Sequence, residues 1–153
     1  MPRQIFRFTL ESSLKARDQG KLDQWVTSYL ESEGKNHRLS KILRQEKYIW
    51  SDIVEYPLDK LERVMGYEEG MKFHEDRDKW ERRVSYFTIC LERGESFAPL
   101  ISTDFWGEVD LSDGSHRFEA LKKSGYKKYW TIFYIKSEDN KEMVLKNISQ
   151  AKL

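Results

Sequence analysis

The chain has 153 residues, with 27 basic and 26 acidic side chains and a single cysteine. A chain of this length is typical of one domain with its own core. One cysteine excludes a disulfide framework and a cysteine-based zinc site, and no apolar run is long enough to span a membrane. We therefore expect a folded cytoplasmic protein with no membrane partner. Its formal charge of +1 argues against a general nucleic-acid coat.

The near-balance of charge hides an uneven distribution along the chain. Residues 1–50 carry ten Lys and Arg against six Asp and Glu, residues 51–110 carry eight against fifteen, and residues 111–153 carry nine against five. An acidic centre thus lies between two basic ends. The total charge therefore does not argue against one focused anion site.

Helices are expected in residues 1–50, which we predict to be an N-terminal helical extension of a domain formed by residues 51–153. Apolar residues from Leu22 to Leu30 follow helical spacing, and Gly34 marks the end of that helix. A second helix follows, and the polar side chains of residues 35–47 give it a basic outer surface. This surface is either a solvated helical face or a contact for DNA or a protein partner.

The rest of the chain alternates between strand and helix patterns. Short strands are expected at 53–58, 98–102 and 109–111, helices at 76–94 and 115–124, and a turn at 137–140 before a terminal helix or strand. Residues 129–135 are a continuous β-branched and aromatic run, typical of a strand covered on both faces. This order predicts an α+β (α/β-like) fold, a small mixed sheet with flanking helices.

One stretch carries the strongest functional signal. A strand ends, Asp113 and Gly114 turn the chain, and a helix begins at Ser115 or His116. A helix N-terminus offers unpaired N–H groups and partial positive charge, and Gly114 lets a bulky anion approach the backbone. His116 and Arg117 oppose the helix dipole in the first turn, which makes sense if an anion lies in front of them. The alternative is an ordinary capped connection with His and Arg exposed.

The residues Asp113-Gly114-Ser115-His116-Arg117 resemble the DGxHR signature of the ParB/sulfiredoxin superfamily. Residues 98–101 resemble its PLIV strand and residues 54–61 its opening strand, so the resemblance covers about residues 52–136. It implies a ParB/sulfiredoxin-like domain that binds ATP, ADP or CTP with Mg²⁺.

The resemblance also implies roles for single residues. Gly114, Ser115, His116 and Arg117 would bind the phosphates, and Asp113 would orient the turn or hold metal-bound water. Ser115 stands where sulfiredoxin has its catalytic cysteine, so sulfinic-acid reduction is not expected. The glycine- and arginine-rich motif and the DNA-reading helix-turn-helix of ParB are missing, so chromosome partition is not expected either.

Kinase-like members of this fold place a carboxylate after the first strand as general base on the acceptor hydroxyl. Residues 62–76 offer five carboxylates, of which Glu68 and Glu69 lie in a loop between Gly66 and Gly70. Together with Asp113 they are the catalytic candidates for hydrolysing the terminal phosphate or transferring it to a small molecule. Whether the chain is an enzyme stays open. A non-enzymatic DNA- or protein-binding module is the alternative, and a nuclease is the least favoured.

A metal site is a further candidate at His74, which precedes Glu75 and Asp76. The spacing matches neither HExxH nor a Cys/His finger. We therefore expect Mg²⁺ to arrive with a nucleotide rather than a dedicated metal site.

Overall fold

The computed structural model describes residues 6–45, 48–105, 108–135 and 138–151. The helices of these residues are α1 (Leu10–Asp18), α2 (Leu22–Glu31), α3 (His37–Gln45), a 3-10 turn η1 (Leu58–Lys60), α4 (Arg77–Glu92), α5 (Ser115–Lys123) and α6 (Glu138–Ala151). Their strands are β1 (Ile49–Trp50), β2 (Val54–Pro57), β3 (Glu62–Arg63), β4 (Met65–Gly66), β5 (Phe73–His74), β6 (Leu100–Phe105), β7 (Glu108–Asp113) and β8 (Lys128–Ile135).

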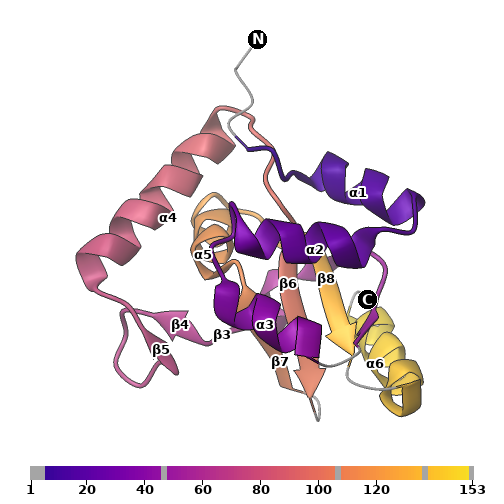
Figure 1. The fold of residues 1–153 in the computed structure, drawn as a ribbon. Coiled ribbons are helices and arrows are strands. Elements are labelled where there is room, and N and C mark those ends of the chain that lie inside the picture. The colour runs from indigo at the N-terminus through magenta and orange to yellow at the C-terminus, as the bar shows by residue number, and fades with distance from the viewer. Residues whose placement is uncertain (1–5, 46–47, 106–107, 136–137, 152–153) are drawn as a thin grey trace.

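The main sheet is mixed and has the order β1-β8-β6-β7-β3, with β2 paired to another part of β8. Strands β6 and β8 are parallel, β6 and β7 are antiparallel, and β7 and β3 are parallel. Strands β4 and β5 form a separate pair, which lies below the first turns of α4 and away from the main sheet (Figure 1). This arrangement confirms the predicted α+β class.

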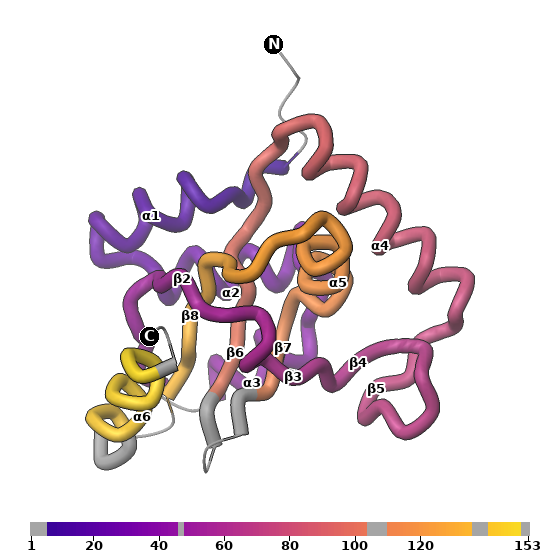
Figure 2. The backbone as a smooth tube through the Cα atoms, turned by 180° about the vertical axis from the view of Figure 1, so that it is seen from behind, coloured from indigo at the N-terminus to yellow at the C-terminus, as the bar shows by residue number. Residues whose placement is uncertain are grey.

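Helices cover both faces of the sheet. Figure 1 shows α2 and α3 in front of β6 and β8, and Figure 2 shows α5 and α6 on the opposite side. Alternate residues of β8 serve the two faces, because Ile132 and Tyr134 pack with α2 and α3, whereas Phe133 and Ile135 pack with α5 and α6. The continuous apolar run of β8 is therefore explained by burial on both sides, as predicted.

The N-terminal helices share a core with the sheet. Val26 and Leu30 of α2 are completely buried in one cluster with Ile101 of β6 and Ile132 of β8. The predicted helices α2 and α3 are confirmed, and this shared core fixes their position relative to β6 and β8.

Helix α4 begins and ends where the sequence indicates. Asp76 caps its first turn by accepting from the Lys79 N–H, and Gly94 with φ of 73° follows its last turn. Trp80 and Val84 are buried against Ala120 of α5. The exposed face of α4 is polar at Glu81 and Arg82 and carries the exposed side chains of Tyr86 and Ile89 further on. The cations Lys79 and Arg83 of the same helix lie beside the α5 N-terminus.

Three parts of the architecture differ from the prediction. Helix α1 is an additional helix, and Thr9 caps its N-terminus. The helix has few apolar residues, so its sequence shows no apolar periodicity. The short strands β1 and β3 rest on long-range pairing, which local sequence does not encode. The turn predicted at 137–140 is wrong where it is described, because α6 already begins at Glu138. None of the described helices is long and apolar enough to cross a membrane.

Candidate functional site

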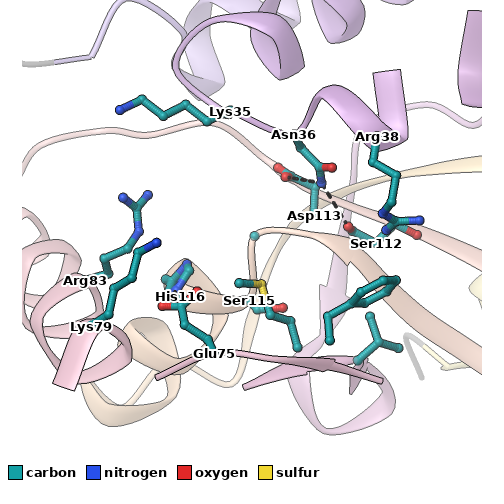
Figure 3. Close-up of a pocket in the computed structure, with 15 residues that line it drawn as sticks. Lys35, Asn36, Arg38, Glu75, Lys79, Arg83, Ser112, Asp113, Ser115 and His116 are labelled. Carbon is teal, nitrogen blue, oxygen red and sulfur yellow. Dashed lines mark hydrogen bonds and ion pairs between the residues drawn. The ribbon is translucent and has the colours of Figure 1, made fainter. Parts of the chain in front are cut away.

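A cavity of about 370 Å³ lies at the N-terminus of α5. Its base is the stretch from Ser112 to His116, where β7 ends and α5 begins. Figure 3 shows Lys79 and Arg83 coming from α4, Lys35 from the segment before α3, and Arg38 from α3. The volume lies within the range of small-molecule sites, toward its lower end.

The first turn of α5 presents backbone donors to this cavity. Gly114 adopts φ of 105° and supplies no side-chain cap, and the first helical bond runs from the Phe118 N–H to the Gly114 carbonyl. The N–H groups of Ser115, His116 and Arg117 precede that bond and are the unpaired donors of a helix N-terminus. A β-carbon on Gly114 would lie 2.7 Å from both the Arg117 guanidinium and the Leu100 side chain. Glycine is therefore required at this position.

Four cationic side chains surround the cavity. None of them forms an ion pair with a carboxylate of the described residues; they are Lys35, Arg38, Lys79 and Arg83. The two acidic side chains in the wall, Glu75 and Asp113, already have partners. The cavity therefore has an excess of positive charge that an anionic ligand would neutralise.

Arg117 lies elsewhere than the sequence suggested. It is 3% exposed, and its guanidinium donates to the carbonyls of Ala98 and Pro99 and, over 2.8 Å, to Asp113. It also lies 5.3 Å from the centre of the Tyr29 ring. We expected a forked phosphate donor, but these internal partners occupy the guanidinium and give Arg117 a structural position behind the turn.

Asp113 is the counterion of Arg117 and also ties two elements together. One carboxylate oxygen accepts from Arg117, and the other accepts from the Asn36 amide over 3.0 Å. Both contacts leave Asp113 8% exposed. The expected role of orienting the turn agrees with this geometry, whereas a role as metal ligand would require giving up a partner.

His116 faces the cavity from the first turn of α5. Its Nε2 lies 2.9 Å from a carboxylate oxygen of Glu75, and its ring lies 4.7 Å from that of Trp80. Burial lowers the pKa of His116 below its ordinary value, although the Glu75 hydrogen bond opposes the shift. His116 is thus favoured as a neutral ring at neutral pH, with Nε2 directed to Glu75 and the other ring nitrogen left for a ligand.

The structure does not bring Glu68 and Glu69 to the cavity. Glu68 pairs with Arg63 over 2.5 Å, and Glu69 is exposed to solvent. Burial acts to raise the pKa of Glu68, but the bonds from Arg63 and the backbone outweigh it and lower that pKa. A carboxylate held in an ion pair is a weak proton acceptor, so this geometry does not favour Glu68 as a general base.

The side chains do not fit a protein-held metal ion. Among the described residues no group of three or more His, Cys, Asp or Glu side chains is placed to bind one. His74, a metal candidate from sequence, instead hydrogen-bonds the Tyr67 carbonyl through Nε2. Any Mg²⁺ at this site would have to be held mainly by ligand phosphates and water.

Sequence reasoning missed the two cations that α4 contributes to the wall. Lys79 and Arg83 are four residues apart and so share one face of α4, a spacing that marks a paired cationic contact once α4 is placed beside α5. Glu75 was one of five acidic candidates, and only the fold singles it out. The basic surface of residues 35–47 is divided, since Lys35 and Arg38 line the cavity while Arg44 pairs with Glu31. Part of this surface, residues 46–47, lies outside the described residues.

No family model and no curated protein matches the chain. Among solved structures, a sulfiredoxin from Arabidopsis thaliana is similar with 21% identity and a TM-score of 0.45, covering 63% of this chain and 97% of that chain. The chromosome-partitioning protein ParB from Caulobacter crescentus, complexed with CTP-gamma-S, is similar with 18% identity and a TM-score of 0.42, covering 67% of this chain and 56% of that chain.

A Pnob8-like ParB-N domain is also similar, with 18% identity and a TM-score of 0.37, covering 67% of this chain and 36% of that chain. This chain thus spans about half or less of the length of the two ParB structures. At these identities the likeness concerns the fold alone.

Proposed function

We propose that this protein binds a nucleotide, with its phosphates at the N-terminus of α5. The observation that carries the proposal is the set of four cations around the cavity without a carboxylate partner in the described residues (Lys35, Arg38, Lys79 and Arg83). They surround the unpaired N–H groups of the first turn of α5. Backbone donors, helix dipole and side-chain cations act in the same direction, and all favour phosphate.

The same cavity has an apolar wall. Val64, Met65 and Phe73 line it on the side of β4 and β5. A ligand that fills it would combine an anionic end with an apolar or aromatic end, as a nucleoside diphosphate or triphosphate does. Inorganic phosphate alone would satisfy only the cationic end.

Binding is tested by isothermal titration with inorganic tripolyphosphate and with ATP and CTP, each with Mg²⁺. We expect the variants Lys79→Glu and Arg83→Glu to weaken binding at least tenfold each, because each removes a charge-assisted contact and adds repulsion. Arg82→Glu is the matched control, since Arg82 is exposed on the same helix and does not line this cavity. The proposal fails if no ligand binds at millimolar concentration, or if all three variants bind alike.

A hydrolytic or phosphoryl-transfer activity at this site is favoured by one specific contact. The Glu75–His116 pair lies inside the cavity, and a carboxylate that orients a neutral histidine is suited to accept a proton from an attacking hydroxyl or water. Glu75 is 7% exposed, so its position is fixed by packing. The cations would stabilise the charge on the transferred group.

The activity is tested by measuring γ-phosphate release from ATP and CTP under single-turnover conditions. His116→Gln and Glu75→Gln should reduce the rate at least a hundredfold while changing nucleotide affinity much less, because general base catalysis contributes about 10²- to 10⁴-fold. Glu68→Gln is the comparison variant and should keep the rate of the native protein. Release that is equal in all three variants would show that the pair takes no part in the reaction.

A further inference from the structure

A second cavity, of about 260 Å³, adjoins the first on the side of the sheet. The two share the side chains of Arg38, Val64, Phe73 and Ser112 in their walls. Arg38 lies 4.2 Å from the centre of the Phe73 ring, and this stacked pair stands at the boundary between them. A ligand bound at α5 can therefore extend past Arg38 into the second cavity.

The carboxylate of Asp110 lies in the wall of this second cavity. Within the described part of the chain, no side chain hydrogen-bonds or ion-pairs with that of Asp110, although it is only partly exposed. Asp110 and Ser112 are two residues apart on β7, and both line this cavity. The intervening Leu111 is buried on the other side of the sheet. The strand that ends at the phosphate site thus places a carboxylate next to it.

The remaining wall combines aromatic rings, hydroxyls, the aliphatic side chains of Leu39 and Ile42, and Lys72. Tyr48 and Tyr134 lie edge to face with ring centres 5.3 Å apart, and Phe73 forms the side shared with the first cavity. The hydroxyls of Ser112 and Tyr134 are hydrogen-bonded over 2.7 Å. Burial raises the pKa of Tyr134, so its hydroxyl stays protonated at neutral pH. Flat aromatic surfaces with a few fixed polar groups are typical of sites for planar heterocycles.

We propose that this second cavity is a base-recognition subsite in which Asp110 accepts a hydrogen bond from an exocyclic amine. The inference rests on the proposed nucleotide function and names the class of nucleotide. A carboxylate only accepts, so it pairs with the amino group of adenine or cytosine and repels the oxo group of hypoxanthine or uracil at the equivalent position. The protein therefore selects amino-bearing bases.

The comparison of ATP with ITP tests this selection, because ITP has an oxo group in place of the exocyclic amine and an N–H at the adjacent ring nitrogen in place of an acceptor. CTP with UTP is a second comparison with the same pair of changes. In the native protein we expect ATP to bind tighter than ITP, and CTP tighter than UTP, by about ten- to hundredfold. Asp110→Asn should reduce each ratio to within about threefold, since an amide can donate to an oxo group as well as accept from an amine. Glu142→Gln, on the exposed face of α6, is the matched control and should keep both ratios.

Inorganic tripolyphosphate separates the two proposals. It reports on the α5 site alone, so Asp110→Asn should bind it as the native protein does, which also shows that the variant is folded. Two results would overturn the base subsite without affecting the proposed phosphate site. In the first, the native protein binds tripolyphosphate but binds ATP and ITP with equal affinity. In the second, Asp110→Asn keeps the native ratio of ATP affinity to ITP affinity. Failure to bind tripolyphosphate or any nucleotide overturns both.

Discussion

Replacing Arg117 by alanine should destabilise the fold rather than only weaken ligand binding. The Arg117 side chain is enclosed, with three hydrogen-bond acceptors around it: the carbonyls of Ala98 and Pro99 and the carboxylate of Asp113. These acceptors hold together the start of β6, the end of β7 and the first turn of α5. Arg117→Ala leaves all three without their donor.

The expected magnitude follows from the burial of the pair. Removing one partner of a buried ion pair costs about 3–5 kcal/mol, because the remaining charge stays buried without compensation. The total free energy of unfolding of a domain is about 5–15 kcal/mol, so this loss is a large fraction of it. For a chain near 150 residues it corresponds to a fall in Tm of roughly 6–20 °C. Arg117→Lys should recover only part, since one ammonium group cannot span the three acceptors.

Urea denaturation followed by tryptophan fluorescence measures the loss directly. Lys123→Ala is the matched control, because Lys123 is an exposed cation near the end of the same helix and should change stability by less than about 0.5 kcal/mol. A double-mutant cycle with Asp113→Asn isolates the pair itself. A stable Arg117→Ala protein, within about 1 kcal/mol of the native one, would refute the structural role, and loss of phosphate binding in that stable variant would restore Arg117 as a ligand contact.

Three further predictions concern the same region. Burial lowers the pKa of His116 in the folded protein below its ordinary value of 6.5. As the pH falls, the histidine therefore takes up a proton in the unfolded chain before it does so in the folded protein. The stability that neutral His116 contributes is complete above pH 6.5 and is lost as the pH falls toward the pKa of the folded state. Urea titrations between about pH 8 and about pH 5.5 should therefore show a smaller loss of stability in His116→Gln than in the native protein. Gly114→Ala should cost about 1–3 kcal/mol in thermal or urea unfolding, because φ of 105° and the close contact with Arg117 both exclude a β-carbon. Glu68→Gln should lower the free energy of unfolding by about 1 kcal/mol through the Arg63 pair and leave tripolyphosphate affinity unchanged in titration calorimetry.

The elements with strong local patterns could be predicted from the sequence. The apolar spacing of α2 and α4 reflects burial of one helix face, and the unbroken apolar run of β8 reflects burial of both faces of the strand. The strand, turn and helix around Gly114 were also predictable, because a glycine between an aspartate and a helix-forming segment leaves few conformations. Helix α1 was not, since its residues are mostly polar and its position depends on the Thr9 cap.

The candidate site could be predicted only in part, for a physical reason. The turn at 113–117 is local, so its backbone donors follow from sequence. The partners of its side chains are not local, because Arg117 meets the carbonyls of residues 98 and 99, and His116 meets Glu75, 41 positions away. Sequence alone therefore placed His116 and Arg117 in front of an external anion, whereas the fold supplies a carboxylate to each of them.

Because Arg117 is paired with Asp113 and His116 is favoured as a neutral ring, the positive charge around the cavity comes from other side chains, two of which lie before residue 51. Asn36 caps α3 by accepting from the Leu39 N–H, and the amide of the same side chain donates to Asp113. The start of α3 is thus tied to the start of α5, which places Lys35 and Arg38 in the wall of the same cavity as Lys79 and Arg83. Because two of the four cations come from residues 1–50, those residues contribute to the proposed phosphate site as well as covering the sheet.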